Sequence, residues 1–310
     1  MTTDEIRGSA TYRAEVRGRL GVAAAGRQFA AEAAMQMLVR GGNAADAGVA
    51  AIFAAAVTEI SHFGLGGEVP IILYLADRKE VVVINGQGVA PAAASTTAFG
   101  DLGIPANGPS AGTVPAVVDA LSIVLAEFGT LSLNDVMAPA ISLADGFPWY
   151  EFLTYYLTPE LENIRRYPSG ARVYLQGPEG RIPTVGSVFR QSELASTLRA
   201  LVDEERRNLS KVGAPRSTRH VTVSTVATSG SGSRRPCRAQ EACSPPPTWR
   251  PIAAVWRGRP NSSLRPTDTA TRCPRRGSGD RGRSCCRRSR CSRVLISWGS
   301  ATTAQIMSTP

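Results

Sequence analysis

The chain has 310 residues and a formal net charge of +10, but this charge is distributed very unevenly. Residues 1–205 carry 14 Lys and Arg against 22 Asp and Glu, whereas residues 206–310 carry 21 against 3 and hold all six cysteines. The basic total therefore describes neither part, and it gives no reason to expect a nucleic-acid or membrane surface on the first 205 residues. We predict one globular domain over 1–205, followed by a tail over 206–310.

The tail is dominated by Arg, Ser, Pro, Thr, Gly, Cys and Ala, and Lys211 is its single lysine. Its apolar residues follow neither the strand nor the helix period, so the tail is predicted to be a disordered, low-complexity segment that does not fold alone. Arginine in large excess over lysine, with recurring Cys, Pro and Trp, is also typical of a GC-rich gene read out of frame. We expect a shifted reading frame after about residue 205, with a genuine disordered segment as the alternative.

The tail offers two further interpretations. Its cysteines form no Cys-x-x-Cys pair and have no histidine nearby, so we expect neither a metal site nor another cofactor; they are Cys237, Cys243, Cys273, Cys285, Cys286 and Cys291. The arginine tracts over 272–293 would bind polyanions through nonspecific phosphate contacts. A nucleic-acid-binding protein that acts through this tail is therefore the alternative function.

The first 20 residues are rich in charge and contain no apolar segment of the secretory type, which predicts a cytoplasmic protein. The most apolar run, residues 44–57, is interrupted by Asp46 and is shorter than the roughly 20 residues that span a bilayer. It is predicted to be a buried helix, and no membrane partner is expected.

Helices are indicated along the first domain by apolar residues at the helical period. Phe29, Ala33 and Met37 lie on one stripe, and Gly41-Gly42 should end that helix. Asn43 is predicted to cap the next helix, residues 44–59, whose small residues suit a central packing position. Further helices are expected over 114–128, over 133–144 with a kink or break at Pro139, and over 191–201.

Two β-rich runs, residues 69–75 and 81–85, are separated by a charged loop and predict a hairpin. Their unbroken apolar stretches favour strands covered on both faces. The preceding Gly64-Leu65-Gly66-Gly67 lacks the third glycine of a dinucleotide fingerprint and runs from helix to strand, so we interpret it as a structural turn. His62 and His220 have no partner at a fixed spacing and are interpreted as turn or surface residues.

Several motifs follow one another in a fixed order: Gly41-Gly42-Asn43-Ala44-Ala45-Asp46-Ala47, Glu59 with Gly64-Leu65-Gly66-Gly67, Gly86-Gln87-Gly88-Val89-Ala90-Pro91, Gly112-Thr113-Val114-Pro115-Ala116, Phe128-Gly129-Thr130-Leu131, Ala138-Pro139-Ala140-Ile141, Leu143-Ala144-Asp145-Gly146-Phe147-Pro148 and, more weakly, 191–198. Together they resemble the large-subunit part of the γ-glutamyltranspeptidases, which are N-terminal nucleophile hydrolases. The resemblance implies an α/β fold, an incomplete αββα sandwich. It also implies acyl transfer or hydrolysis of γ-glutamyl amides such as glutathione.

The family's nucleophile is a threonine in a Thr-Thr-His context, whose own α-amino group serves as base after self-cleavage. The Thr-Thr pairs of this chain begin at Thr2, Thr96 and Thr302, and none is followed by histidine. We therefore assign no catalytic residue. By the resemblance, this chain is expected to be truncated and inactive unless a small subunit completes it.

A second departure concerns substrate binding. The family's Gly-Arg-Glu-x-Ala-Pro loop uses its arginine to hold the substrate α-carboxylate, and Gln87 stands at that position here, followed by Gly88. A neutral amide donates a hydrogen bond but supplies no charge. Gln87 is thus the candidate substrate-binding residue by resemblance, and an acyl group other than γ-glutamyl stays open.

Overall fold

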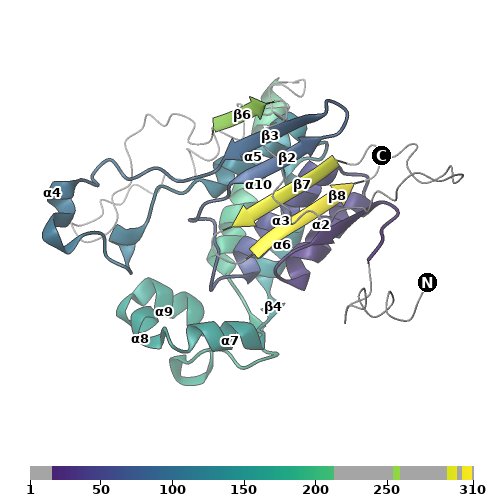
Figure 1. The fold of residues 1–310 in the computed structure, drawn as a ribbon. Coiled ribbons are helices and arrows are strands. Elements are labelled where there is room, and N and C mark those ends of the chain that lie inside the picture. Colours follow the sequence, from purple (N-terminus) through teal and green to yellow (C-terminus); the bar gives the residue numbers. More distant parts are fainter. Residues whose placement is uncertain (1–15, 213–253, 259–291, 299–301, 309–310) are drawn as a thin grey trace, which may run out of the picture.

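The computed structural model describes residues 16–212, 254–258, 292–298 and 302–308. Six strands form an antiparallel sheet in the order β1-β8-β7-β2-β3-β6, and two short strands, β4 and β5, pair separately (Figure 1). The bounds of the strands are β1 Gly21–Ala24, β2 Ile71–Leu75, β3 Glu80–Asn85, β4 Phe147–Pro148, β5 Val188–Phe189, β6 Ala254–Gly258, β7 Ser292–Trp298 and β8 Thr302–Ser308.

The helices either lie against one face of this sheet or belong to segments that extend away from it. The long ones are α2 Gln28–Val39, α3 Ala44–Thr58, α5 Val117–Phe128, α6 Leu133–Asp145 and α10 Ser192–Val212. The short ones are α4 Thr96–Phe99, α7 Glu151–Leu157, α8 Leu161–Arg166 and α9 Pro168–Tyr174, with 3₁₀ turns at Gly100–Leu102, Pro109–Ala111 and Pro178–Gly180. No helix in the described part of the chain is long and apolar enough to cross a membrane.

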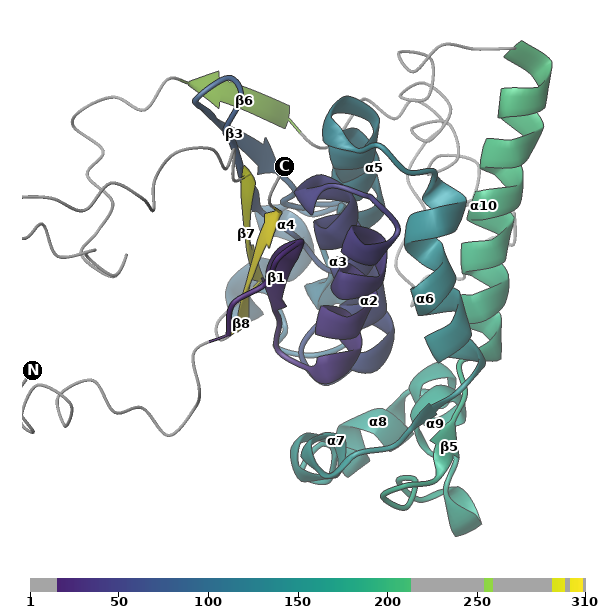
Figure 2. The same ribbon diagram turned by 90° about the vertical axis from the view of Figure 1, so that its right-hand side faces the viewer.

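The described elements form three layers. Figure 2 shows the sheet edge-on, with α2, α3 and α5 beside it and α6 and α10 in a further layer. Helix α3 occupies the centre: all of its residues are buried, and it contacts α2, α5, α6 and the sheet. The alanines and glycine of α3 permit this close approach on every side, so the predicted central packing helix is confirmed.

Local signals set the ends of the first two helices as the sequence predicts. Gly41, which follows α2, has a φ of +84°, a left-handed conformation that glycine adopts cheaply. The Asn43 side chain accepts hydrogen bonds from Ala45 N and Asp46 N, while Asp46 accepts from Asn43 N, so the two residues form a capping box.

Other predicted helices are longer or shifted. Helix α6 continues through Pro139 as one helix, so of the predicted kink or break the break is wrong. Helix α10 runs well past the predicted end at residue 201 and crosses the expected domain boundary at 205. Its buried Glu205 accepts hydrogen bonds from Leu133 N at 3.0 Å and Asn134 N at 3.4 Å, the first residues of α6. A carboxylate at a helix N-terminus satisfies N–H groups that have no partner within the helix.

The hairpin of β2 and β3 is present, but the expectation that both of its faces are covered is wrong for the described residues. Ile71, Leu73, Val82 and Ile84 face the helices and are fully buried. On the opposite face Ile72 is 46% exposed, and its neighbours Tyr74, Val81 and Val83 are half-buried. Among the described elements, no helix covers this apolar face of the sheet (Figure 1).

Three segments of the tail are strands, which its scattered apolar residues did not predict. Each pairs with a strand of the first domain: β8 with β1, β7 with β2 and β6 with β3. These strands therefore extend a sheet begun by the first domain. The six cysteines, His220 and the arginine tracts over 272–291 lie outside the described residues.

Candidate functional site

Three connections meet at one end of the main sheet. The strand register aligns Ala24 of β1 in one row with Ile72 of β2 and Val83 of β3, through the two intervening strands. β1 and β3 end at the same end of the sheet at which β2 begins. The segments 25–27, 59–70 and 86–95 therefore all lie at this end of the sheet, which we call the site end.

The loop that carries Gln87 is held tightly at the site end. Val69 N donates to Gly86 O at 2.9 Å, and Val114 N donates to Val89 O at 2.9 Å, so the loop lies between two backbone segments. A Cβ at Gly86 would lie 2.2 Å from Val69 O, and one at Gly88 would lie 2.3 Å from Val114 O. Only glycine fits at either position in this backbone.

Gln87 itself is exposed, between these two constrained glycines. Its N–H donates to Asn85 Oδ1 at 3.2 Å, an Asx-type contact that fixes the turn out of β3. The side-chain amide supplies two N–H donors and one acceptor without charge. The loop therefore presents one neutral hydrogen-bonding side chain on a rigid backbone.

A buried carboxylate lies at the C-terminal end of α3, in the same group of connections. Glu59 is 6% exposed, and its Oε1 has no hydrogen-bond partner among the described residues. Burial raises the pKa of Glu59 from 4.5 to about 6, and the nearby positive charge of Arg27 opposes that rise. A buried and incompletely paired carboxylate lowers stability at neutral pH, and carboxylates with a perturbed pKa cluster at functional sites.

Arg27, just before α2, is embedded in aromatic rings. Its guanidinium carbon lies 3.5 Å from the centre of the Phe152 ring and 5.6 Å from that of Tyr150, a cation–π arrangement. The exposed His62 ring packs on Phe152 and Tyr156, with centroids 5.5 and 4.4 Å apart. Ser61 Oγ is 2.8 Å from His62 Nδ1. His62 is thus a surface turn residue, as the sequence predicts.

Two side chains near the ends of the segment 149–190 donate hydrogen bonds to the last carbonyls of α3. Tyr150 donates its hydroxyl to Thr58 O at 2.8 Å, and Gln191 donates Nε2 to Val57 O at 2.7 Å. Burial raises the pKa of Tyr150 to about 12, helped by the negative charge of Glu59. The hydroxyl therefore stays protonated and remains a donor at any physiological pH.

The remaining candidates are distributed as follows. Thr96 and Thr97 begin the exposed helix α4, Thr302 and Thr303 begin β8, and Thr2 lies outside the described residues. Gly67 N donates to Gly64 O at 3.0 Å, which confirms the structural turn there. Glu59, Arg27 and Tyr150 are not among the site residues that the sequence predicts. The available signal was that Glu59 is the only Asp, Glu, Lys or Arg between Asp46 and Glu68.

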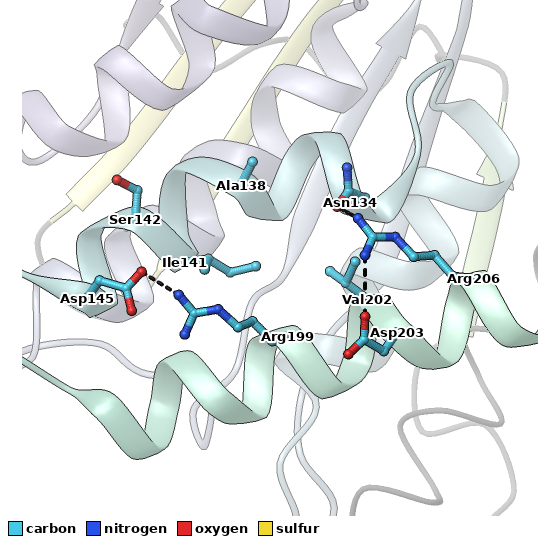
Figure 3. A pocket seen from close by; sticks show the side chains of 9 residues that line it. All are labelled: Asn134, Ala138, Ile141, Ser142, Asp145, Arg199, Val202, Asp203 and Arg206. Carbon is cyan, nitrogen blue, oxygen red and sulfur yellow. Dashed lines mark hydrogen bonds and ion pairs between the residues drawn. The ribbon is translucent and has the colours of Figure 1, made fainter.

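A separate shallow pocket lies between α6 and α10 (Figure 3). Its charged walls are paired with each other: Arg199 with Asp145, and Arg206 with Asp203 at 3.4 Å and with Asn134 Oδ1 at 2.7 Å. These pairs are exposed to solvent, so each contributes little. The pocket belongs to the helical layers rather than to the loops of the site end, and it is not the candidate site.

Comparison with known proteins identifies the fold and family. The family model for gamma-glutamyltranspeptidase matches residues 30–211. The chain belongs to this family. It is 34% identical over 181 residues to a glutathione hydrolase-like proenzyme, YwrD, of Bacillus subtilis, covering 57% of this chain and 34% of the relative. It is also 34% identical over 192 residues to an oxamate amidohydrolase proenzyme of Klebsiella pneumoniae, covering 59% and 36%.

A solved structure supports the same assignment. The gamma-glutamyltranspeptidase of Helicobacter pylori matches with a TM-score of 0.58 and 27% identity, covering 61% of this chain and 56% of that one. The described sheet with helices on one face is thus an incomplete αββα sandwich of the N-terminal nucleophile hydrolase type. The chain spans about a third of the length of the curated relatives it matches.

Proposed function

We propose that this chain supplies the acyl-binding part of an amide hydrolase or acyltransferase, and that a small-subunit segment supplies the nucleophilic threonine. The reaction class, amide hydrolysis or acyl transfer, is inferred from membership of the family. The need for a further segment rests on the Thr-Thr pairs, none of which precedes a histidine. The bare apolar sheet face around Ile72 supports it as well, since a second sheet would cover that face.

The neutral side chain of Gln87 favours a substrate whose acyl group carries no charge. At the position where the family's arginine clamps a carboxylate, an exposed neutral amide is held between two glycines that leave no room for another side chain. Glutamine gives a carboxylate one ordinary hydrogen bond in place of a bidentate charged pair. We propose that Gln87 binds a neutral acyl group by its amide, and that γ-glutamyl amides are the poorer substrates.

A chimera tests this proposal. Residues 30–211 of this chain replace the matching segment of the Bacillus subtilis relative, and the product is followed for self-cleavage on a gel and for amine release from γ-glutamyl and neutral acyl anilides. We expect self-cleavage and faster turnover of a neutral acyl anilide. Gln87→Arg should move the preference about 10- to 100-fold toward γ-glutamyl, the worth of a hydrogen bond to a charged group.

The unmodified relative and a chimera without its nucleophilic threonine are the controls. Failure to cleave or to turn over any anilide would contradict the assigned reaction class. Turnover in which Gln87→Arg leaves the preference unchanged would contradict only the role of Gln87. The alternative function, nucleic-acid binding through the tail, has no such support, because the matched family segment ends at residue 211, before the arginine tracts.

A further inference from the structure

The buried carboxylate of Glu59 lies where α7 is attached to the body of the protein. Tyr150, immediately before α7, donates to Thr58 O, and Phe152, within α7, lies under the Arg27 guanidinium. Glu59 follows Thr58 directly, and its own N–H donates to Ala55 O at 2.7 Å, so it is fixed at the end of α3. One small region therefore holds the start of α2, the end of α3 and the start of α7 together.

The charges in this region are unbalanced when Glu59 is ionised. The described groups that act electrostatically with Glu59 are Arg27, from the segment before α2, and Tyr150, from the segment before α7. His62, in the turn of Glu59 itself, packs on Phe152 and Tyr156. The carbonyl end of α3 adds partial negative charge beside the carboxylate. Arg27 is shared between Glu59 and the aromatic rings of the α7 segment, so it compensates Glu59 incompletely.

We propose that Glu59 is a proton-operated latch for α7: its neutral form lets α7 remain closed on the end of α3, and its ionisation loosens α7 and the two helices that follow. The closed arrangement keeps Glu59 buried and leaves its Oε1 without a partner among the described residues, whereas an opened arrangement would hydrate both oxygens. Ionisation therefore favours opening. The proposal does not depend on the proposed function, because it concerns only the attachment of α7.

The size of the effect follows from proton linkage. The closed state binds the Glu59 proton with a pKa of about 6, against 4.5 for the hydrated group. As the pH rises from below 4.5 to above 6, the ratio of closed to open α7 should fall by up to about 30-fold. Tyr150, whose pKa is raised to about 12, keeps its proton throughout this range, and Glu59→Gln separates the contribution of Glu59 from that of other groups.

Hydrogen exchange resolved by peptide tests the latch on the full chain between pH 4.5 and 8, with labelling times scaled to the intrinsic rate at each pH. We expect peptides over 149–175 to lose protection as the pH rises, while those of α2, α5 and α6 keep theirs. Glu59→Gln should remove this dependence, because its amide carries no charge at any pH. Glu68→Gln, a charge removal in the same connection, is the matched control and should behave as the wild type.

A second variant guards against a Glu59→Gln chain that does not fold. Because Arg27 lowers the pKa of Glu59, Arg27→Gln should move the midpoint of the loss of protection to a higher pH. A merely structural role of Arg27 would lower protection at every pH without moving that midpoint. The latch is overturned if Glu59→Gln keeps the wild-type pH dependence, if Arg27→Gln leaves the midpoint in place, or if α2, α5 and α6 lose protection in parallel with α7.

Discussion

The Asp46 carboxylate and Thr130 join two segments that lie 84 residues apart. Asp46 Oδ1 accepts from Thr130 N at 2.8 Å and from Leu131 N at 3.0 Å, and Oδ2 accepts from Thr130 Oγ1 at 2.6 Å. The same carboxylate caps α3 through Asn43 N. A fully buried charge is tolerated because each oxygen receives more than one donor.

Replacing Asp46 by alanine should therefore be among the more damaging single changes. The substitution leaves several partly buried N–H groups without an acceptor, and we expect a loss of about 3 kcal/mol in the free energy of unfolding. Urea unfolding followed by circular dichroism measures it. Asp135, which forms a capping box with Ser132 in α6, is the matched control, and its alanine variant should cost only about 1 kcal/mol. Equal losses would show that the long-range bonds of Asp46 add nothing.

Glu59→Gln should stabilise the chain at neutral pH. The pKa of Glu59 is raised in the folded state, so the folded chain binds this proton more tightly than the unfolded chain does, and stability falls as the pH rises from 4.5 through 6. The wild type should lose about 2 kcal/mol relative to the variant between pH 4 and pH 7.5. Urea unfolding at both pH values is the measurement. A difference between the two proteins that does not change with pH would contradict the burial effect.

Alanine at Gly86 should destabilise the site end. The added Cβ would meet the backbone oxygen of Val69, which cannot move without breaking the hydrogen bond between Val69 N and Gly86 O. We expect a loss of about 1–3 kcal/mol, the usual cost of overpacking. Gln87→Ala, one residue along and exposed, is the control and should change the melting temperature very little. If both variants melt alike, the loop is not confined as the structure indicates.

The bare sheet face predicts association. The full chain should bind an apolar dye strongly or aggregate unless a matching small subunit is co-expressed, because Ile72 on that face is 46% exposed and its described neighbours are only half-buried. Ile72→Thr should reduce dye binding, whereas Leu73→Thr, on the helix-facing side of the same strand, should unfold the domain instead. A monodisperse wild-type chain with weak dye binding and a sharp cooperative melt would show that the sheet face is already covered.

The tail can be tested by proteolysis. The composition of the tail over 206–310 predicts that trypsin cuts it before the first domain, because an arginine-rich chain without an apolar period should leave its backbone exposed outside the three paired strands. Fragment masses over a time course identify the sites. Cleavage of the two parts at the same rate would favour a packed tail.

The genomic sequence is an independent check, since a +1 or −1 reading downstream of codon 205 should restore Thr-Thr-His if the frame is shifted.

The local features of the first domain follow from the sequence because they depend on neighbouring residues. The apolar stripe of α2, the glycine after it and the capping box of α3 each involve groups within about four positions of one another. The hairpin of β2 and β3 is equally local. The family could also be recognised from the sequence, because several short motifs follow one another along the chain in a fixed order.

The tertiary structure decided what depends on pairing between distant segments. Which face of β2 lies bare, where β6, β7 and β8 pair and how Glu205 caps α6 are set by contacts over long sequence distances, which no local period encodes. The same holds for Glu59, Arg27 and Tyr150. The sequence marks Glu59 as a lone charge but does not indicate its partners, and only the meeting of the start of α2, the end of α3 and the start of α7 buries the carboxylate and raises its pKa.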